Sequence, residues 1–333
     1  MKEKAKRLLS RKERTVPILS FPSAQLLGIS VRELISSARN QADGMKAIAE
    51  RCPVGASLNM MDLSVEAEAF GAKIRVSEHE NPTVEKGVID DIADAASVTV
   101  PAVGAGRTGI CVEGVRLAKR EIADVPVFCG VIGPYSLAGR LFDMTELMME
   151  CYDSPDEVKT LLGKCAAFLA SYIRAFQEAG ADGVILAEPA AGLLSPVLAE
   201  EFSTPFVKQI FDAVDRDDFV LCYHNCGRSA EDMADSLSAL PADVFHFGNA
   251  VNLQKMLAAM PADRIVMGNV DPVLFRRGTP EEIRADVRRV YNACGGYDNF
   301  MISSGCDIPA ASGWDNIDAY FDEVKAIYGT GRH

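Results

Sequence analysis

The chain has 333 residues, with 47 acidic against 34 basic side chains and a formal net charge of −13. Such a surface repels nucleic acid and anionic membranes, so we exclude both as main partners. A hydrophobic content of 48% provides a sizeable core. The length suits one large α/β barrel with an extension, or two smaller domains.

Nine cysteines are scattered along the chain without the spacing of a disulfide framework. This pattern is typical of a reducing compartment, where thiols fill cores or bind metals. The N-terminal stretch MKEKAKRLLSRKER is charged, and neither an apolar stretch nor a small-residue cleavage site follows it. No uncharged apolar window of about 18 residues occurs. We therefore expect a cytoplasmic protein.

The N-terminal third shows few clear elements. Strands are predicted over 16–21 (VPILSF) and 96–100 (ASVTV). The segment 101–116 is rich in glycine and matches the G-x-G-x-x-G spacing from Gly104 to Gly109. No strong strand leads into it and no acidic ribose partner follows, so we interpret it as a loop before a helix rather than a dinucleotide site.

From about residue 125 onward, strands and helices alternate. Amphipathic stretches predict helices such as 155–179 and 280–293, each with proline in its first turn and acidic residues after it. Repeated strand–helix units imply a parallel sheet, either closed as a barrel or open and doubly wound. No linker interrupts the pattern, which favours one domain over 1–333 with an N-terminal elaboration. The predicted strands of this region are 125–130, 183–187, 219–224, 244–247, 265–268 and 299–303.

Several reactive side chains fall at or just beyond the ends of these strands. In a parallel α/β protein the carboxyl ends of the strands face one active site, so residues far apart in sequence meet there. The side chains in question are those of Glu188, His224, Cys226, Asp271 and Cys306.

Three of these residues form a candidate zinc site. His224 and Cys226 are two apart, so in an extended chain their side chains point the same way. Cys306 follows a later strand and supplies a third ligand, which leaves one zinc position open for catalysis. Spacing alone leaves a second interpretation open, in which both cysteines are ordinary buried thiols and His224 is a hydrogen-bonded core histidine.

Glu188 and Asp271 are the candidate catalytic residues. Three roles are open for Glu188: a fourth zinc ligand in the resting state, a base for an incoming thiol, or a loop anchor. Asp271 precedes Pro272 and has either a site role or an Asx-turn role. His246, which alternates with apolar residues, is interpreted as a satisfied core histidine. We expect the thiols at positions 129, 165, 222 and 294 to fill the core.

On these residues the chain resembles the uroporphyrinogen decarboxylase superfamily, and within it the methylcobamide-dependent methyltransferases. The specific elements are the H-x-C of YHNCG (223–227) and the GC-x-x-P of SSGCDIP (303–309). The resemblance also covers TVPI (15–18), DLSVEAEAFGAKI (62–74), GPYSLAGRLF (133–142), GADGVILAEPAAGLLSP (180–196) and GNVDP (268–272).

The resemblance implies a (β/α)8 TIM barrel with zinc at its carboxyl-terminal mouth, held by His224, Cys226 and Cys306. It further implies that zinc holds an acceptor thiol as thiolate, which attacks the methyl group of a methylcorrinoid. Glu188 sits where branch members carry an acidic residue near the metal, and Asp62 falls near a position that is acidic in the decarboxylases. No D-x-H-x-x-G corrinoid-binding element occurs, so a separate corrinoid protein is the expected partner.

Three more functions compete with this one. A uroporphyrinogen decarboxylase, a metal-free lyase, holds eight substrate carboxylates with an arginine-bearing segment after the first strand, but residues 20–30 here contain neither arginine nor lysine. Two interpretations remain for the other arginines considered: they contact anions, or they are solvated surface residues. These arginines are Arg107, Arg140 and Arg228. The second competing function is that of an inactive corrinoid-binding homologue. The third is a donor-side methyltransferase that loads a corrinoid protein, with zinc polarising the donor oxygen.

Overall fold

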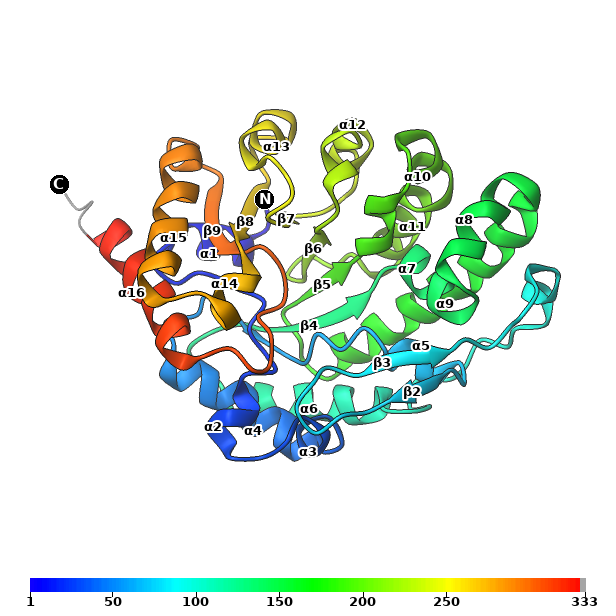
Figure 1. The fold of residues 1–333 in the computed structure, drawn as a ribbon, viewed down its shortest axis with the longest axis horizontal. Helices are drawn as coiled ribbons and strands as arrows, with labels where there is room; N and C mark the ends of the chain where they lie inside the picture. The colour runs from blue at the N-terminus through cyan, green and yellow to red at the C-terminus, as the bar shows by residue number, and fades with distance from the viewer. Residues whose placement is uncertain (330–333) are drawn as a thin grey trace.

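The computed structural model describes residues 1–329, which form a curled parallel sheet with helices around it (Figure 1). The sheet has seven strands in the order β1-β4-β5-β6-β7-β8-β9. Every neighbouring pair in this order is parallel, as in a TIM barrel. The strands are β1 (Ser57–Leu58), β4 (Val127–Ile132), β5 (Gly183–Ala187), β6 (Val220–Asn225), β7 (Val244–Phe247), β8 (Ile265–Val270) and β9 (Phe300–Ser304).

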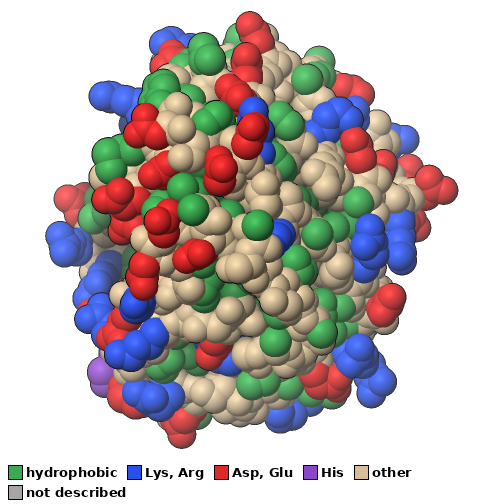
Figure 2. Space-filling model, turned by 90° about the vertical axis from the view of Figure 1, so that its right-hand side faces the viewer, with side chains coloured by type: hydrophobic (Ala, Val, Ile, Leu, Met, Phe, Trp, Pro, Cys, Tyr) green, Lys and Arg blue, Asp and Glu red, His purple; other side chains and the backbone are tan. Residues whose placement is uncertain are grey.

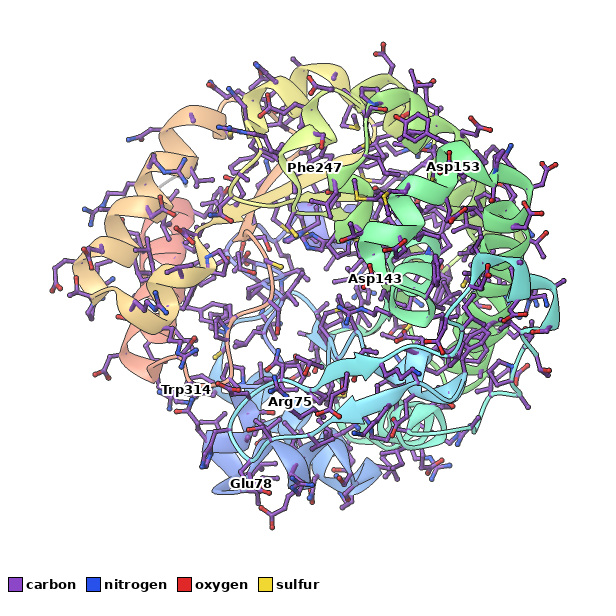
Figure 3. All side chains as sticks on the ribbon, turned by 45° about the vertical axis from the view of Figure 1, so that its right-hand side comes forward. Arg75, Glu78, Asp143, Asp153, Phe247 and Trp314 are labelled. Atoms are coloured by element: carbon purple, nitrogen blue, oxygen red, sulfur yellow. The ribbon has the colours of Figure 1, made fainter. Side chains whose placement is uncertain are left out.

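The helices surround the strands as a ring (Figure 3). A small antiparallel pair, β2 (Lys73–Arg75) and β3 (Thr83–Lys86), belongs to the N-terminal elaboration. No helix among residues 1–329 is long and apolar enough to cross a membrane. The helices are α1 (Glu3–Leu9), α2 (Ser23–Leu27), α3 (Val31–Ile35), α4 (Ala38–Arg51), α5 (Val65–Ala69), η1 (Ile92–Ser97), α6 (Thr108–Glu121), α7 (Pro134–Leu141), α8 (Met144–Asp153), α9 (Pro155–Glu178), η2 (Pro189–Leu193), α10 (Pro196–Phe202), α11 (Thr204–Val214), η3 (Arg228–Glu231), α12 (Ala234–Ser238), α13 (Leu253–Ala259), α14 (Pro272–Arg277), α15 (Pro280–Cys294) and α16 (Trp314–Gly329).

The predicted elements after residue 125 are confirmed. The six predicted strands correspond to β4 through β9, and the two predicted helices correspond to α9 and α15. Thr279 caps α15 in a capping box with Glu282, and Pro280 takes the first helical position. Residues 101–107 of the glycine-rich segment form a loop before a helix, as predicted, and residues 108–116 already belong to α6. These elements are governed by local patterns, which is why the sequence places them well.

The strand predicted over 16–21 is an extended segment outside the regular sheet, and it occupies the gap between β9 and β1. The bonds of this stretch to β9 run through hydroxyl side chains rather than through a main-chain ladder, and they include one from the Thr15 hydroxyl to the Ile302 carbonyl. The Ser303 hydroxyl donates to the Val16 carbonyl at 2.8 Å, and the Ile18 amide donates to the Ser304 hydroxyl at 3.0 Å. On the other side, the Gly55 amide donates to the Thr15 carbonyl at 2.7 Å. This segment therefore closes the barrel.

The strand predicted over 96–100 is wrong. Residues 92–97 form the 3-10 helix η1, and the chain after it lies outside the sheet. The Lys164 ammonium donates to the carbonyls of Ala96 and Val98 at 2.6 Å each, which holds this stretch against α9. The β-branched run has the composition of a strand, but no strand among residues 1–329 pairs with it.

Alternating strand residues separate the barrel interior from the layer beneath the helices. One buried cluster holds the inward residues, among them Ile185, Ala187, Cys222, Val244 and Met301. Their sequence neighbours Val184, Leu186, Leu221, Phe245 and Ile302 pack in a larger cluster under the helices. This parity decides which polar residues at the strand ends face the mouth of the barrel.

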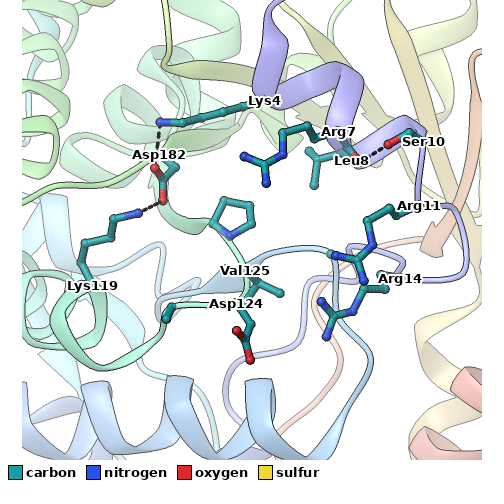
Figure 4. A pocket seen from close by; sticks show the side chains of 13 residues that line it. Lys4, Arg7, Leu8, Ser10, Arg11, Arg14, Lys119, Asp124, Val125 and Asp182 are labelled. Atoms are coloured by element: carbon teal, nitrogen blue, oxygen red, sulfur yellow. Dashed lines mark hydrogen bonds and ion pairs between the residues drawn. The ribbon is translucent and has the colours of Figure 1, made fainter.

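Helix α1 covers the amino-terminal end of the barrel, with Ala5 and Leu8 in the interior cluster. Beside it lies a hollow of 340 Å³ lined by basic side chains such as Arg7 and Arg14 (Figure 4). The buried Asp182 carboxylate anchors this end, because it pairs with Lys4 at 2.8 Å and with Lys119. The hollow lies at the opposite strand ends from the candidate metal ligands.

Glu66 of α5 attaches the N-terminal elaboration to the sheet. Its carboxylate accepts a hydrogen bond of 3.0 Å from the Ile132 amide at the end of β4. Burial of this side chain raises its pKa from 4.5 to about 7, against the opposing effect of that amide. The folded chain therefore keeps a proton on Glu66 at pH values where the unfolded chain has lost it.

We expect the free energy of unfolding to fall as the pH rises from about 5 to about 7, since the raised pKa means that the folded state binds more protons in this range. The Glu66→Gln variant should lose that part of the decline. Urea unfolding at a series of pH values, for both proteins, measures the difference. An identical pH dependence in the variant would contradict the assignment.

Candidate metal centre at the barrel mouth

The ends of β6 and β9 bring three potential metal ligands together. The side-chain ligand atoms of His224, Cys226 and Cys306 all lie within 4.8 Å of one another, and no other such group of three occurs among residues 1–329. His224 Nε2 lies 3.7 Å from Cys306 Sγ. In a tetrahedral zinc site with ordinary bond lengths, a nitrogen and a sulfur ligand are separated by about 3.6 Å. The three residues therefore fit a zinc ion with one position left for another ligand.

The two thiols influence each other's acidity. The neighbouring Cys306 thiol lowers the pKa of Cys226 to about 7. The neighbouring Cys226, together with burial, raises the pKa of Cys306 to about 12. One thiolate is thus accessible near neutral pH without a metal. The thiolate form is the one that binds zinc.

His224 is held from behind by a second histidine. The Nδ1 atoms of His224 and His246 lie 2.6 Å apart, and His246 Nε2 lies 2.9 Å from the Ser303 hydroxyl. Burial lowers the pKa of His246 well below 6.5, with His224 as a further cause. The interpretation of His246 as a satisfied core histidine is correct as to its burial, but it misses the contact with a candidate ligand. The available signal was that two neighbouring strands both carry histidine near their ends.

The Glu188 side chain points away from the three ligands, although its amide donates to the His224 carbonyl at 2.9 Å. Its oxygens accept hydrogen bonds from the amides of Tyr135 at 2.9 Å and Ser136 at 2.7 Å, and from the Ser136 hydroxyl. Burial raises its pKa to about 7 against these opposing hydrogen bonds. Of the three roles predicted for Glu188, the geometry matches the anchor, here of the N-terminus of α7. Glu188 continues the parity of Leu186, which faces the helices rather than the barrel interior.

Asp271 caps α14. Its carboxylate accepts a hydrogen bond of 2.9 Å from the Val273 amide, with Pro272 in the first helical position. The sequence left two roles open for Asp271, one in a turn and one in catalysis. Its geometry matches the turn-forming role. Asp271 does not line the hollow at the candidate metal centre.

That hollow has a volume of 210 Å³ and is lined by the three candidate ligands, with Asp62, Asn81, Arg140 and Asp307 among the surrounding residues. Arg107 is a buried structural residue, because it pairs with Asp62 and with Glu68, the latter at 2.6 Å. Arg228 is exposed, as expected of a solvated residue. Only Arg140 of the three arginines lines the hollow, and burial lowers its pKa.

Comparison with known proteins points to one family. The profile of uroporphyrinogen decarboxylase (URO-D) matches residues 17–327. The methylcobamide:CoM methyltransferase MtbA of Methanosarcina mazei is 27% identical over 252 residues, which cover 74% of this chain and 72% of the relative. A uroporphyrinogen decarboxylase of Chlorobium limicola is 26% identical over 255 residues, covering 73% and 70%.

Solved structures agree on the architecture. A methyltransferase from Methanosarcina mazei superposes with a TM-score of 0.86 at 22% identity, covering 98% of this chain and 99% of the other. A B12-independent methionine synthase from Shewanella sp. W3-18-1 superposes with a TM-score of 0.64 at 14% identity, covering 90% of each chain. These likenesses establish the barrel fold. Because the family profile spans residues 17–327, the chain belongs to the uroporphyrinogen decarboxylase family.

Proposed function

We propose that the protein is a zinc-dependent methyltransferase that moves a methyl group from a methylcorrinoid to a small thiol. The observation that carries this proposal is the convergence of His224, Cys226 and Cys306 on one point beside a hollow at the barrel mouth. The relative from Methanosarcina mazei, named for methyl transfer from methylcobamide to CoM, supports the same reaction class.

His224, Cys226 and Cys306 would hold the zinc ion through one nitrogen and two sulfur atoms, and a tetrahedral site would keep its fourth position for the acceptor. Zinc, when bound, would keep the acceptor sulfur in its thiolate form near neutral pH. In the transfer, the acceptor sulfur forms a bond to the methyl carbon while the carbon–cobalt bond breaks. The electron pair of that bond stays on cobalt, which passes from Co(III) to Co(I).

The hollow limits the size and charge of the acceptor. A volume of 210 Å³ suits a small thiol, whereas a corrin ring is far larger and has to approach from outside. A separate corrinoid protein that docks on the mouth meets this requirement. The face that lies on the right in Figure 1 carries acidic and hydrophobic side chains interspersed in its upper part (Figure 2).

Arg140 provides a binding group for an anionic acceptor. Its guanidinium has no hydrogen bond or ion pair to any of residues 1–329, although the Glu66 and Asp62 carboxylates act on it electrostatically. It shares the hollow with the three candidate ligands. A guanidinium in a partly desolvated site binds a sulfonate or carboxylate through charge-assisted hydrogen bonds. We therefore place the anionic end of the acceptor at Arg140 and its sulfur at the metal.

A decarboxylase function fits this hollow poorly. A substrate with eight carboxylates needs several cations, and Arg140 is the one arginine or lysine among the described residues that line the hollow. Residues 20–30 also lack arginine and lysine. The donor-side methyltransferase uses the same ligands with the opposite direction of transfer, so it is separated from our proposal by the substrates that turn over.

Replacement of Cys306 by serine should remove bound zinc. We expect about one zinc ion per chain in the wild type and a sharp loss in Cys306→Ser, since a catalytic zinc site depends on each of its three protein ligands. Elemental analysis of protein purified without a chelating tag measures this. Cys294→Ser, which alters a buried thiol of α15, is the control and should keep its zinc. A wild type that stays free of zinc after reconstitution would refute the metal mechanism.

Replacement of Arg140 by glutamine should raise KM for an anionic thiol. Loss of a charge-assisted contact predicts an increase of about tenfold or more for 2-mercaptoethanesulfonate, with little change for neutral 2-mercaptoethanol. The assay follows loss of the methyl–cobalt absorbance of methylcobalamin under anaerobic conditions. Arg228→Gln is the matched control on the exposed surface. Equal effects on both thiols would show that Arg140 does not bind the anion.

A further inference from the structure

A chain of hydrogen bonds behind His224 ends in a group that can only accept. The Ser303 hydroxyl lies 2.8 Å from the Val16 carbonyl oxygen. A carbonyl has no proton to give, so the hydroxyl uses its single proton in this bond. Toward any third partner, the Ser303 oxygen is therefore an acceptor.

The direction of the remaining bonds follows from this first one. His246 Nε2 lies 2.9 Å from the Ser303 oxygen, so Nε2 carries a proton and donates it. None of the hydrogen-bond partners of His246 is negatively charged, which favours the neutral imidazole with an unprotonated Nδ1. Because that Nδ1 lies 2.6 Å from His224 Nδ1, the proton between the two rings belongs to His224.

A second contact of His224 Nδ1 independently assigns the proton to this nitrogen. His224 Nδ1 also lies 3.2 Å from the carbonyl oxygen of His246, which again can only accept. Both neighbours of this nitrogen thus require it to carry a proton. His224 Nε2, on the other side of the ring, is then left unprotonated, and its lone pair accepts from the Cys306 thiol at 3.7 Å.

We infer that His246 and Ser303 are positioning residues that fix His224 in its Nδ1–H tautomer, so that Nε2 is ready to bind the metal. This inference rests on the proposed zinc site. The opposite tautomer would point a proton at the metal position and would have to rearrange before binding. The two rings lie 4.6 Å apart between centroids at 55°, so His246 also restricts the rotation of the His224 ring. Partners of this kind behind a metal-binding histidine typically change metal affinity by about 10- to 100-fold.

The first experiment reads the tautomer directly, without metal or substrate. The chain has four histidines, so ring ¹⁵N chemical shifts of histidine-labelled metal-free protein can be assigned with single His variants. We expect His224 to show a protonated Nδ1 and an unprotonated Nε2. In Ser303→Ala the population of that tautomer should fall, because the Val16 carbonyl no longer sets the direction of the chain. A proton on His224 Nε2 in the wild type would overturn the inference.

The second experiment measures zinc affinity by competition with a chelator. His246→Met keeps the volume but removes both hydrogen bonds, and we expect zinc binding to weaken by about 10- to 100-fold. His246→Gln should restore part of the affinity, because an amide can accept from His224 and donate to Ser303. Met301→Leu, inside the same barrel cluster, is the packing control and should bind zinc like the wild type.

The outcomes separate this inference from the proposed function. Wild-type zinc affinity in His246→Met would refute the positioning role even if the enzyme is a zinc methyltransferase. A wild type that binds no zinc would refute the proposed function, whereas the ¹⁵N measurement would still test the tautomer. Should His246→Met fail to fold by circular dichroism, Ser303→Ala tests the same chain with a smaller change.

Discussion

The barrel depends on how residues 15–20 join β9 to β1. Serine hydroxyls of β9 bond the main chain of this segment at Val16 and Ile18, in place of a regular strand ladder. These contacts fix the end of β9, and the end of β9 carries Cys306 toward His224. Because Ser303 also bonds His246, the closure of the barrel and the orientation of a metal ligand share one hydroxyl group. A change at this seam would therefore affect fold and site together.

The polar residues around the mouth divide into those that face the hollow and those that build its walls. Glu188 binds the N-terminus of α7, Asp271 caps α14 and Arg107 neutralises Asp62, so each already has its hydrogen-bonding partners within the fold. The candidate ligands and Arg140 face the hollow instead. A buried carboxylate that accepts from several donors stabilises a loop, whereas a group with unused hydrogen-bonding or metal-binding capacity is available to a ligand.

Membership of the uroporphyrinogen decarboxylase family does not by itself assign a reaction, since its members include decarboxylases and methyltransferases. Our choice between these two reactions rests on the chemistry of the residues at the site. Two thiols and an imidazole suit a soft Lewis acid and a sulfur acceptor, and a single guanidinium suits one anionic group. A substrate with many carboxylates would need more cationic side chains than the described lining of the hollow provides.

The sequence by itself determined the alternation of strands and helices after residue 125 and the three residues that converge at the mouth. Both follow from short-range information: hydrophobic periodicity, proline and acidic helix starts, and the fact that parallel strands end on one side. The side to which Glu188 points, the partner of His246 and the environment of Arg140 were decided only by the tertiary structure. Each depends on the register of one strand against another, or on a helix distant in sequence, and residue spacing carries no record of such contacts.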